Sequence, residues 1–246
     1  MKKFITIIII ASLALCCSSA SGYESAETDD EGVWSLETFD SGEEYLLNSV
    51  SGEKIAKAFG YNEAGELVEI PLDEYLDIKN SIAASALPES GGSADYLTMP
   101  MSASSWYYDY RETSSYVGVG TPMKLTADIK GPAAILGWDS VTVEHDFGGE
   151  TGLSAAMKER IQRGASFPWN IYADLGTSCD YRFEIPAGYI GYMRFTPYMN
   201  YTVGDLYYVY VASLVYDETH LGEVWGASPK KLANGRCDGL FELIYK

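Results

Sequence analysis

The sequence GYIGYMRFTPY at residues 188–198, followed by LYYVYV at residues 206–211, decides the fold class of this chain. Both stretches are dominated by tyrosine, which forms strands readily and combines an apolar ring with a polar hydroxyl. Residues two apart on a strand share a face, so these tyrosines fall into rows. The stretches predict a rigid sheet with an amphipathic surface, which is more typical of recognition than of catalysis.

Strand-like segments separated by turn formers extend outward from this region. Strands are expected at residues 106–110, 115–119, 123–129, 133–138, 141–147, 169–173, 180–185, 189–196, 206–216, 222–225 and 240–245. Turn formers such as Val203-Gly204-Asp205 and Asp238-Gly239 lie between them, and one short helix is expected at Leu153–Arg163. We therefore predict a mainly β fold, an antiparallel β-sandwich or barrel-like domain of about ten strands. The run Tyr207–Tyr216, apolar on both faces, is expected to be a central strand buried on both sides.

Charge and tyrosine content divide the chain at the linker-like segment Pro88–Asp95. Residues 23–95 carry 18 acidic and 3 basic side chains, whereas residues 96–246 carry 17 and 12, together with 16 of the 20 tyrosines. We therefore predict an acidic N-terminal region, residues 23–95, and a tyrosine-rich β domain, residues 96–246.

The acidic region is expected to be partly folded. It begins without periodicity from Tyr23 to about Leu36, which predicts disorder. A hairpin is then expected between Ala56–Phe59 and Glu66–Ile70, followed by a helix at Asp73–Ala86 with acidic residues in its first turn. This region is either a propeptide that masks the second domain or a solvated spacer with one docked helix.

Residues 1–22 are predicted to be a secretory signal peptide of the bacterial type. Lys2 and Lys3 precede a short apolar run, Phe4–Leu15, and small residues at positions 18–22 offer cleavage sites. The run is short for a retained membrane helix, and no other segment is apolar enough to cross a membrane as a helix. A lipid anchor at Cys16 or Cys17 is not expected, because neither cysteine follows the small residue usual in lipoprotein signals. We therefore expect a secreted protein.

The charge of the chain excludes one class of partner. Loss of the two signal lysines changes the formal net charge from −18 to −20. Such a charge repels nucleic acid and weakens the approach to an anionic membrane. The two cysteines left after cleavage, Cys179 and Cys237, are predicted to form a disulfide in an exported protein, with two buried thiols as the alternative.

Signals for catalysis are sparse. His145 and His220 both lie in acidic runs, without a nucleophile motif or metal-ligand spacing, and are interpreted as surface histidines. No cofactor is expected. Two groups of carboxylates near turns offer oxygen ligands for Ca²⁺, although such groups are more often the polar rims of loops: Glu144, Asp146 and Glu150, and Asp205, Asp217 and Glu218.

Aromatic residues supply the functional hypothesis. Exposed rows of tyrosine and tryptophan suit sugar rings or protein surfaces, whereas the alternative is packing within the sheet. The candidate ligand-binding residues are Trp106, Tyr108, Tyr110, Tyr192, Tyr198, Tyr208 and Tyr210.

Three functions follow from these observations. The first is a secreted, non-catalytic protein that binds an extracellular or cell-envelope ligand, a glycan or a protein. The second is a pore-forming β-protein, released from its acidic prosegment, that inserts through Asp139–Ile185. The third is a secreted hydrolase that uses two carboxylates. The sequence leaves the oligomeric state open.

Overall fold

The described part of the chain contains two helices and fifteen strands. The computed structural model describes residues 33–84, 105–149, 152–176, 178, 181–212 and 215–246. The predicted signal peptide, residues 1–22, and the segment Pro88–Asp95 lie outside these residues. The domain boundary at that segment and the role of residues 1–22 therefore stay predictions.

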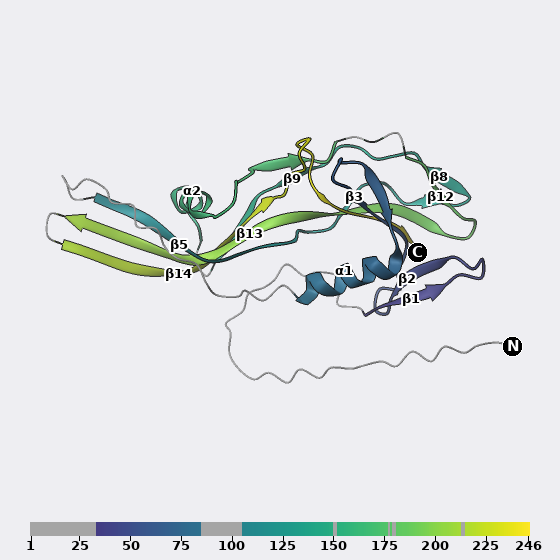
Figure 1. Ribbon diagram of the computed structural model, residues 1–246, viewed down its shortest axis with the longest axis horizontal. Coiled ribbons are helices and arrows are strands. Elements are labelled where there is room, and N and C mark those ends of the chain that lie inside the picture. The colour runs from purple at the N-terminus through teal and green to yellow at the C-terminus, as the bar shows by residue number, and fades with distance from the viewer. Residues whose placement is uncertain (1–32, 85–104, 150–151, 177, 179–180, 213–214) are drawn as a thin grey trace.

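Eleven strands form one antiparallel sheet, and four more form two small ribbons (Figure 1). The order of the main sheet is β1 (Trp34–Thr38), β2 (Glu44–Asn48), β3 (Lys54–Tyr61), β15 (Gly239–Tyr245), β13 (Ile190–Ala212), β14 (Val215–Pro229) and β10 (Asp146–Gly149). Strand β4 (Leu67–Ile70) pairs with β3, and β5 (Ser105–Val119), β6 (Met123–Lys124) and β7 (Ile129–Lys130) pair with β13. The ribbons are β8 (Ala133–Ile135) with β12 (Phe183–Ile185), and β9 (Thr142–Glu144) with β11 (Tyr172–Asp174).

Strand β13 is the spine of the molecule. It runs for 23 residues, about 75 Å at the usual rise per residue, from one end of the molecule toward the other (Figure 1). The two quoted tyrosine stretches belong to this one strand. The segment Val203-Gly204-Asp205, predicted to be a turn, lies in its middle. Gly204 has no side chain there, and a Cβ atom would lie 2.3 Å from the backbone oxygen of Arg111 on β5.

The ribbons cover one face of the main sheet and form a core rich in aromatic residues. The rings of Phe59 and Phe183 lie 5.1 Å apart, and those of Trp138 and Phe241 lie 5.0 Å apart. Phe195 and Phe241, on neighbouring strands of the sheet, are fully buried in this core. The opposite face of the sheet packs against helix α1 (Leu72–Ala84), whose Tyr75 is buried among Ile55, Leu240 and Ile244.

The acidic region contributes directly to the main sheet. Its strand β3 pairs with β15 from Lys54 to Gly60, and its helix α1 closes over a buried carboxylate, Glu242. Glu242 accepts a hydrogen bond from the Tyr75 hydroxyl at 2.6 Å and lies 3.2 Å from the Lys79 ammonium and 2.5 Å from the Arg194 guanidinium. Release of this region as a propeptide, which stays a prediction, would have to break these contacts.

Several local predictions are confirmed. The predicted hairpin is β3 paired with β4, and its turn is closed by Asn62 and by Gly65 at φ +75°. The predicted helices correspond to α1 and to α2 (Ala155–Gly164), although α2 begins after a capping box at Ser154. The mainly β, antiparallel character is also confirmed.

Four predictions are wrong. The main sheet does not close within the described residues, so the barrel-like alternative fails. Trp34–Leu36 belong to β1, because they pair with β2, and are not disordered. The run Tyr207–Tyr216 is not one central strand, because residues 207–212 belong to β13, residues 215–216 belong to β14, and Ala212 pairs with Val215. The strand buried on both faces is instead β15, since it lies between α1 and the aromatic core.

The predicted disulfide is not found in the described part of the structure. Cys237 is a free thiol that is fully buried, and Cys179 lies outside the described residues. Burial, with a smaller effect from Asp238, raises the pKa of Cys237 to about 12. The thiol is therefore protonated and unreactive at neutral pH.

Candidate binding surface on the β arm

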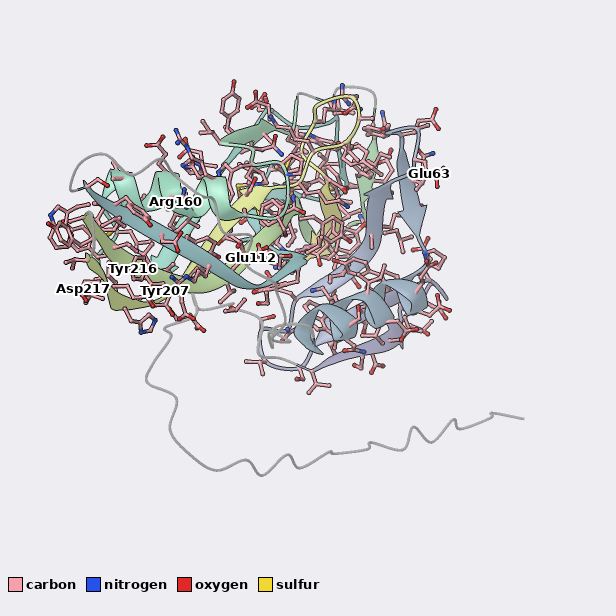
Figure 2. The ribbon with its side chains drawn as sticks, turned by 60° about the vertical axis from the view of Figure 1, so that its left-hand side comes forward. Glu63, Glu112, Arg160, Tyr207, Tyr216 and Asp217 are labelled. Atoms are coloured by element: carbon pink, nitrogen blue, oxygen red, sulfur yellow. The ribbon has the colours of Figure 1, made fainter. Side chains whose placement is uncertain are left out.

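A three-stranded arm projects from one end of the molecule. We define the arm as residues 105–112 of β5, 204–212 of β13 and 215–222 of β14, which pair in register with β13 in the centre. Figure 1 shows it at the left, beside α2. In Figure 2 the labelled Tyr216 and Asp217 lie near its free end, and Arg160 lies on α2.

Two irregularities in strand pairing mark the base of the arm. The register with β5 shifts between Val203 and Gly204, and the register with β14 shifts between Leu206 and Tyr207. Each shift leaves one extra residue on the outer strand, Thr113 on β5 and Leu221 on β14. Bulges of this kind bend a strand and increase its twist. They set the direction in which the arm leaves the rest of the sheet.

One face of the arm carries a cluster of aromatic rings in contact. Trp106 and Tyr108 on β5 lie opposite Tyr210 and Tyr208 on β13. The ring of Trp106 lies 4.7 Å from that of Tyr208, with the planes 10° apart, and 4.3 Å from that of Tyr210. The Tyr108 ring lies 5.4 Å from Tyr208. We call Trp106, Tyr108, Tyr208 and Tyr210 the aromatic cluster. Trp106 remains 57% exposed, so part of its surface is open to a ligand.

Three of the predicted binding residues lie apart from this cluster. Tyr110 is buried beneath α2, and its hydroxyl shares a 2.6 Å hydrogen bond with Thr202. Tyr192 is buried on the α1 side and donates to Glu53 at 2.5 Å. Burial raises the pKa of both phenols. Tyr198 is half-buried, with the Lys230 ammonium 5.4 Å from its ring. We leave these three tyrosines out of the candidate surface.

The opposite face of the arm carries an ion-pair network. Arg111 contacts Asp109 at 3.1 Å and Glu218 at 2.7 Å, and it lies 4.1 Å over the Tyr207 ring. The Tyr216 hydroxyl donates to Glu218 at 2.7 Å. Hydrogen bonds from Arg111 and Tyr216 lower the pKa of Glu218. The network joins β5 to β14 across the central strand, which stiffens the arm.

Helix α2 holds the base of the arm. Its Ile161 is fully buried with Leu206 and Val224, and its Arg160 reaches Asp109 at 3.0 Å. The capping box at Ser154 and the hydrogen bond from the Ala165 amide to Ile161 define its two ends. Because Ile161 and Arg160 of α2 both contact the base of the arm, the cluster is carried on a fixed support.

A shallow depression of about 360 Å³ lies on the ribbon formed by β9 and β11. It is lined by Thr142, Glu144, His145, Ile171, Tyr172 and Asp174. Nδ1 of His145 accepts a hydrogen bond from the indole of Trp169 at 3.1 Å, which orients the ring. Tyr172 is 54% exposed, and the Lys231 ammonium lies 5.3 Å from its ring. The depression is the second candidate surface.

The other predicted sites find little support in the described residues. His220 lies on β14 rather than in a loop, 2.9 Å from Asp205. In the part of the chain that the structure describes, no group of three or more His, Cys, Asp or Glu side chains is arranged to hold a metal ion, and Glu150 lies outside it. Residues 141–147, expected to form one strand of the inserting segment, are divided between β9 and β10, which pair with different partners.

Sequence reasoning missed the exposed end of the arm. Tyr107, Val215 and Tyr216 are 37%, 54% and 60% exposed there. The segment VASLVY at residues 211–216 contains no Gly, Pro, Asn or Asp, and Ser213 is its one residue of a type that is common in turns. The two charges that follow it, Asp217 and Glu218, were the available signal that the apolar run does not continue.

No family model, no curated protein and no solved structure matches this chain. Among the described helices, neither has the length and apolar composition needed to cross a bilayer. The function must therefore be argued from the arm and the depression themselves.

Proposed function

We propose that this chain is a secreted, non-catalytic binding protein that contacts an extracellular or cell-envelope ligand through the aromatic cluster of the arm. One observation carries the proposal: Trp106 is stacked on Tyr208 and contacts the ring of Tyr210, yet 57% of its surface is exposed. Exposing a large ring is unfavourable in water, and such rings supply much of the binding free energy at recognition surfaces.

The support beneath the cluster favours binding without rearrangement. The rings are fixed by strand pairing, by mutual stacking and by α2 at the base of the arm. A surface that is already ordered loses little conformational entropy when a ligand binds. The apolar rings provide area, while the hydroxyls of Tyr108, Tyr208 and Tyr210 add hydrogen-bonding groups at its edge.

A pull-down from cell-wall fractions, glycans and envelope proteins, followed by isothermal titration with the retained ligand, tests the proposal. We compare the wild-type chain with Trp106→Ala and with Tyr172→Ala, whose side chain is similarly exposed but lies on the other candidate surface. Loss of binding in Trp106→Ala alone supports the arm as the binding surface. Loss in Tyr172→Ala alone transfers the function to the depression, and binding unaffected by either substitution refutes both assignments.

The depression supports a second candidate, a carboxylate-dependent hydrolase. Glu144 and Asp174 lie on one face of the ribbon, with Tyr172 directly opposite Glu144, and His145 borders the same hollow. Paired carboxylates are the chemical requirement for glycoside hydrolysis. A hydrolase screen on the purified chain, repeated with Glu144→Gln, tests this candidate. Turnover that survives the substitution excludes Glu144 as a catalytic residue.

A further inference from the structure

The free end of the arm exposes apolar side chains on both of its faces. The last four rows of paired residues, which end at Ala212 and Val215, contain the exposed side chains Trp106, Tyr107, Val215 and Tyr216. Trp106 shares a face with Tyr210, whereas Tyr107 and Tyr216 lie on the opposite face, because neighbouring residues on a strand alternate. A sugar-binding platform needs one such face. Exposed apolar side chains on both faces suit an apolar medium that surrounds the end of the arm.

Only the last two rows of the arm, which hold Val215 and Tyr216, are free of charge. Within the same four rows the charged residues are Asp217, in the third row from the end, and Glu218, in the fourth. At about 3.3 Å per residue, the first carboxylate lies about 7 Å from the end of the strands. Glu218 is paired with Arg111. The charge-free depth thus matches the 5–10 Å to which interfacial segments enter the headgroup boundary of a bilayer.

The residue types also match that boundary. Tryptophan and tyrosine concentrate at membrane–water interfaces, where the ring reaches the acyl chains while the N–H or O–H group stays hydrated. The carboxylate of Asp217 and the open surface of Trp106 lie on the same face of the arm. Carboxylates and aromatic faces both attract a quaternary ammonium, as in phosphatidylcholine, whereas Asp217 repels an anionic headgroup.

We propose that the end of the arm inserts into the interfacial layer of a zwitterionic lipid bilayer. Val215 and Tyr216 are the deepest side chains, and Trp106 and Tyr107 lie at the level of the headgroups, in the rows of Asp217 and Glu218. The inference rests on the proposed function and names the lipid surface as its ligand. The rest of the protein stays in water, because the ion pairs of Arg111 with Asp109 and Glu218 would have to be desolvated before the arm could enter farther.

Vesicle flotation with the full-length chain tests the proposal. Phosphatidylcholine vesicles are compared with vesicles that contain phosphatidylserine. Trp106→Ser and Tyr216→Ser remove one ring from each face, and Val50→Ser removes an apolar side chain that is 77% exposed between β2 and β3, away from the arm. All variants share the same N-terminus, so a difference between them reports on the arm. Near-UV circular dichroism confirms that each variant is folded.

We expect the wild type and Val50→Ser to float with phosphatidylcholine, and each ring variant to partition about tenfold more weakly. Phosphatidylserine should reduce binding by all of them. Trp106 is the one tryptophan among the five that is exposed, so lipids brominated near the headgroup should quench fluorescence in the wild type, with little quenching in Trp106→Phe. Absence of flotation, flotation equal in both ring variants and wild type, or quenching unchanged in Trp106→Phe would overturn the proposal.

The same variants separate this inference from the proposed function. If Trp106→Ala loses a glycan or protein ligand while vesicles never bind, the arm is a binding surface and its assignment to lipid is wrong. If neither vesicles nor the ligand panel respond to substitution of Trp106, both proposals fail.

Discussion

Replacement of Glu242 by glutamine removes the charge at the centre of the buried network between α1 and the sheet. The Glu242 side chain is 1% exposed and contacts Arg194, Lys79 and Tyr75. Burial alone would raise the pKa of this carboxyl, but the charges of Lys79 and Arg194 and the hydrogen bonds from Arg194 and Tyr75 outweigh it and lower the pKa to about 2.

The contribution of the Glu242 charge to the free energy of unfolding follows from this pKa. A displacement from 4.5 in the unfolded chain to about 2 in the folded protein corresponds to about 3 kcal/mol of stability. Because the pKa is lowered by folding, this stability is present above pH 4.5 and declines as the pH falls toward 2. It should be about 3 kcal/mol at pH 5 and about 1.4 kcal/mol at pH 3. At pH 7 the Glu242→Gln variant should lose about 3–5 kcal/mol, because two partly buried cations then face a neutral amide.

Urea unfolding followed by tryptophan fluorescence measures the free energy of unfolding at pH 7, 5 and 3. Glu69→Gln is the matched control, since Glu69 is also paired with a lysine, Lys57, but both side chains are about half exposed. The control should stay close to the wild type at each pH. The reasoning is refuted if Glu242→Gln is as stable as the wild type at pH 7, or if its deficit is the same at pH 5 and pH 3.

Three further changes test the backbone and the thiol. Gly204→Ala should destabilise the protein by more than about 2 kcal/mol in thermal unfolding, because its Cβ would meet the backbone of Arg111. Gly152→Ala, which has open space around it, should be neutral, and equal effects at the two glycines would contradict the bulge. Ser154→Ala should cost about 0.5–2 kcal/mol through loss of the α2 cap, and unchanged stability would argue against that cap. Iodoacetamide should label Cys237 only after denaturation without reductant, as read by mass spectrometry. Labelling of the native protein, or none after denaturation, would contradict a buried free thiol.

Local patterns predicted the elements whose signals are contained within a few residues. The hairpin of β3 and β4 was found because apolar alternation flanks a turn containing Asn62 and Gly65. Helix α1 was found because its apolar stripe and acidic first turn are both local. In the candidate site, Trp106, Tyr108, Tyr208 and Tyr210 were named from the sequence, since residues two apart on a strand share a face.

Other features depended on contacts between distant residues. Gly204 has the composition of a turn, yet it lies within β13 opposite the bulge at Thr113, where the backbone of β5 is too close for a side chain. Tyr192 has the same strand context as Tyr208, but α1 covers its side of the sheet. The acidic region was separated from the β domain by charge, whereas the pairing of β3 with β15 joins residues 180 or more positions apart.

By itself the sequence determined that this chain forms antiparallel strands rich in amphipathic rings, because strand propensity and two-residue alternation are properties of neighbouring residues. Only the tertiary structure decided which rings are exposed and which are core. Exposure depends on what packs against a face, and the covering elements, α1 over Tyr192 and α2 over Tyr110, come from distant parts of the chain. At the end of the arm no described element covers Trp106 or Tyr216, and that is where the binding surface is proposed.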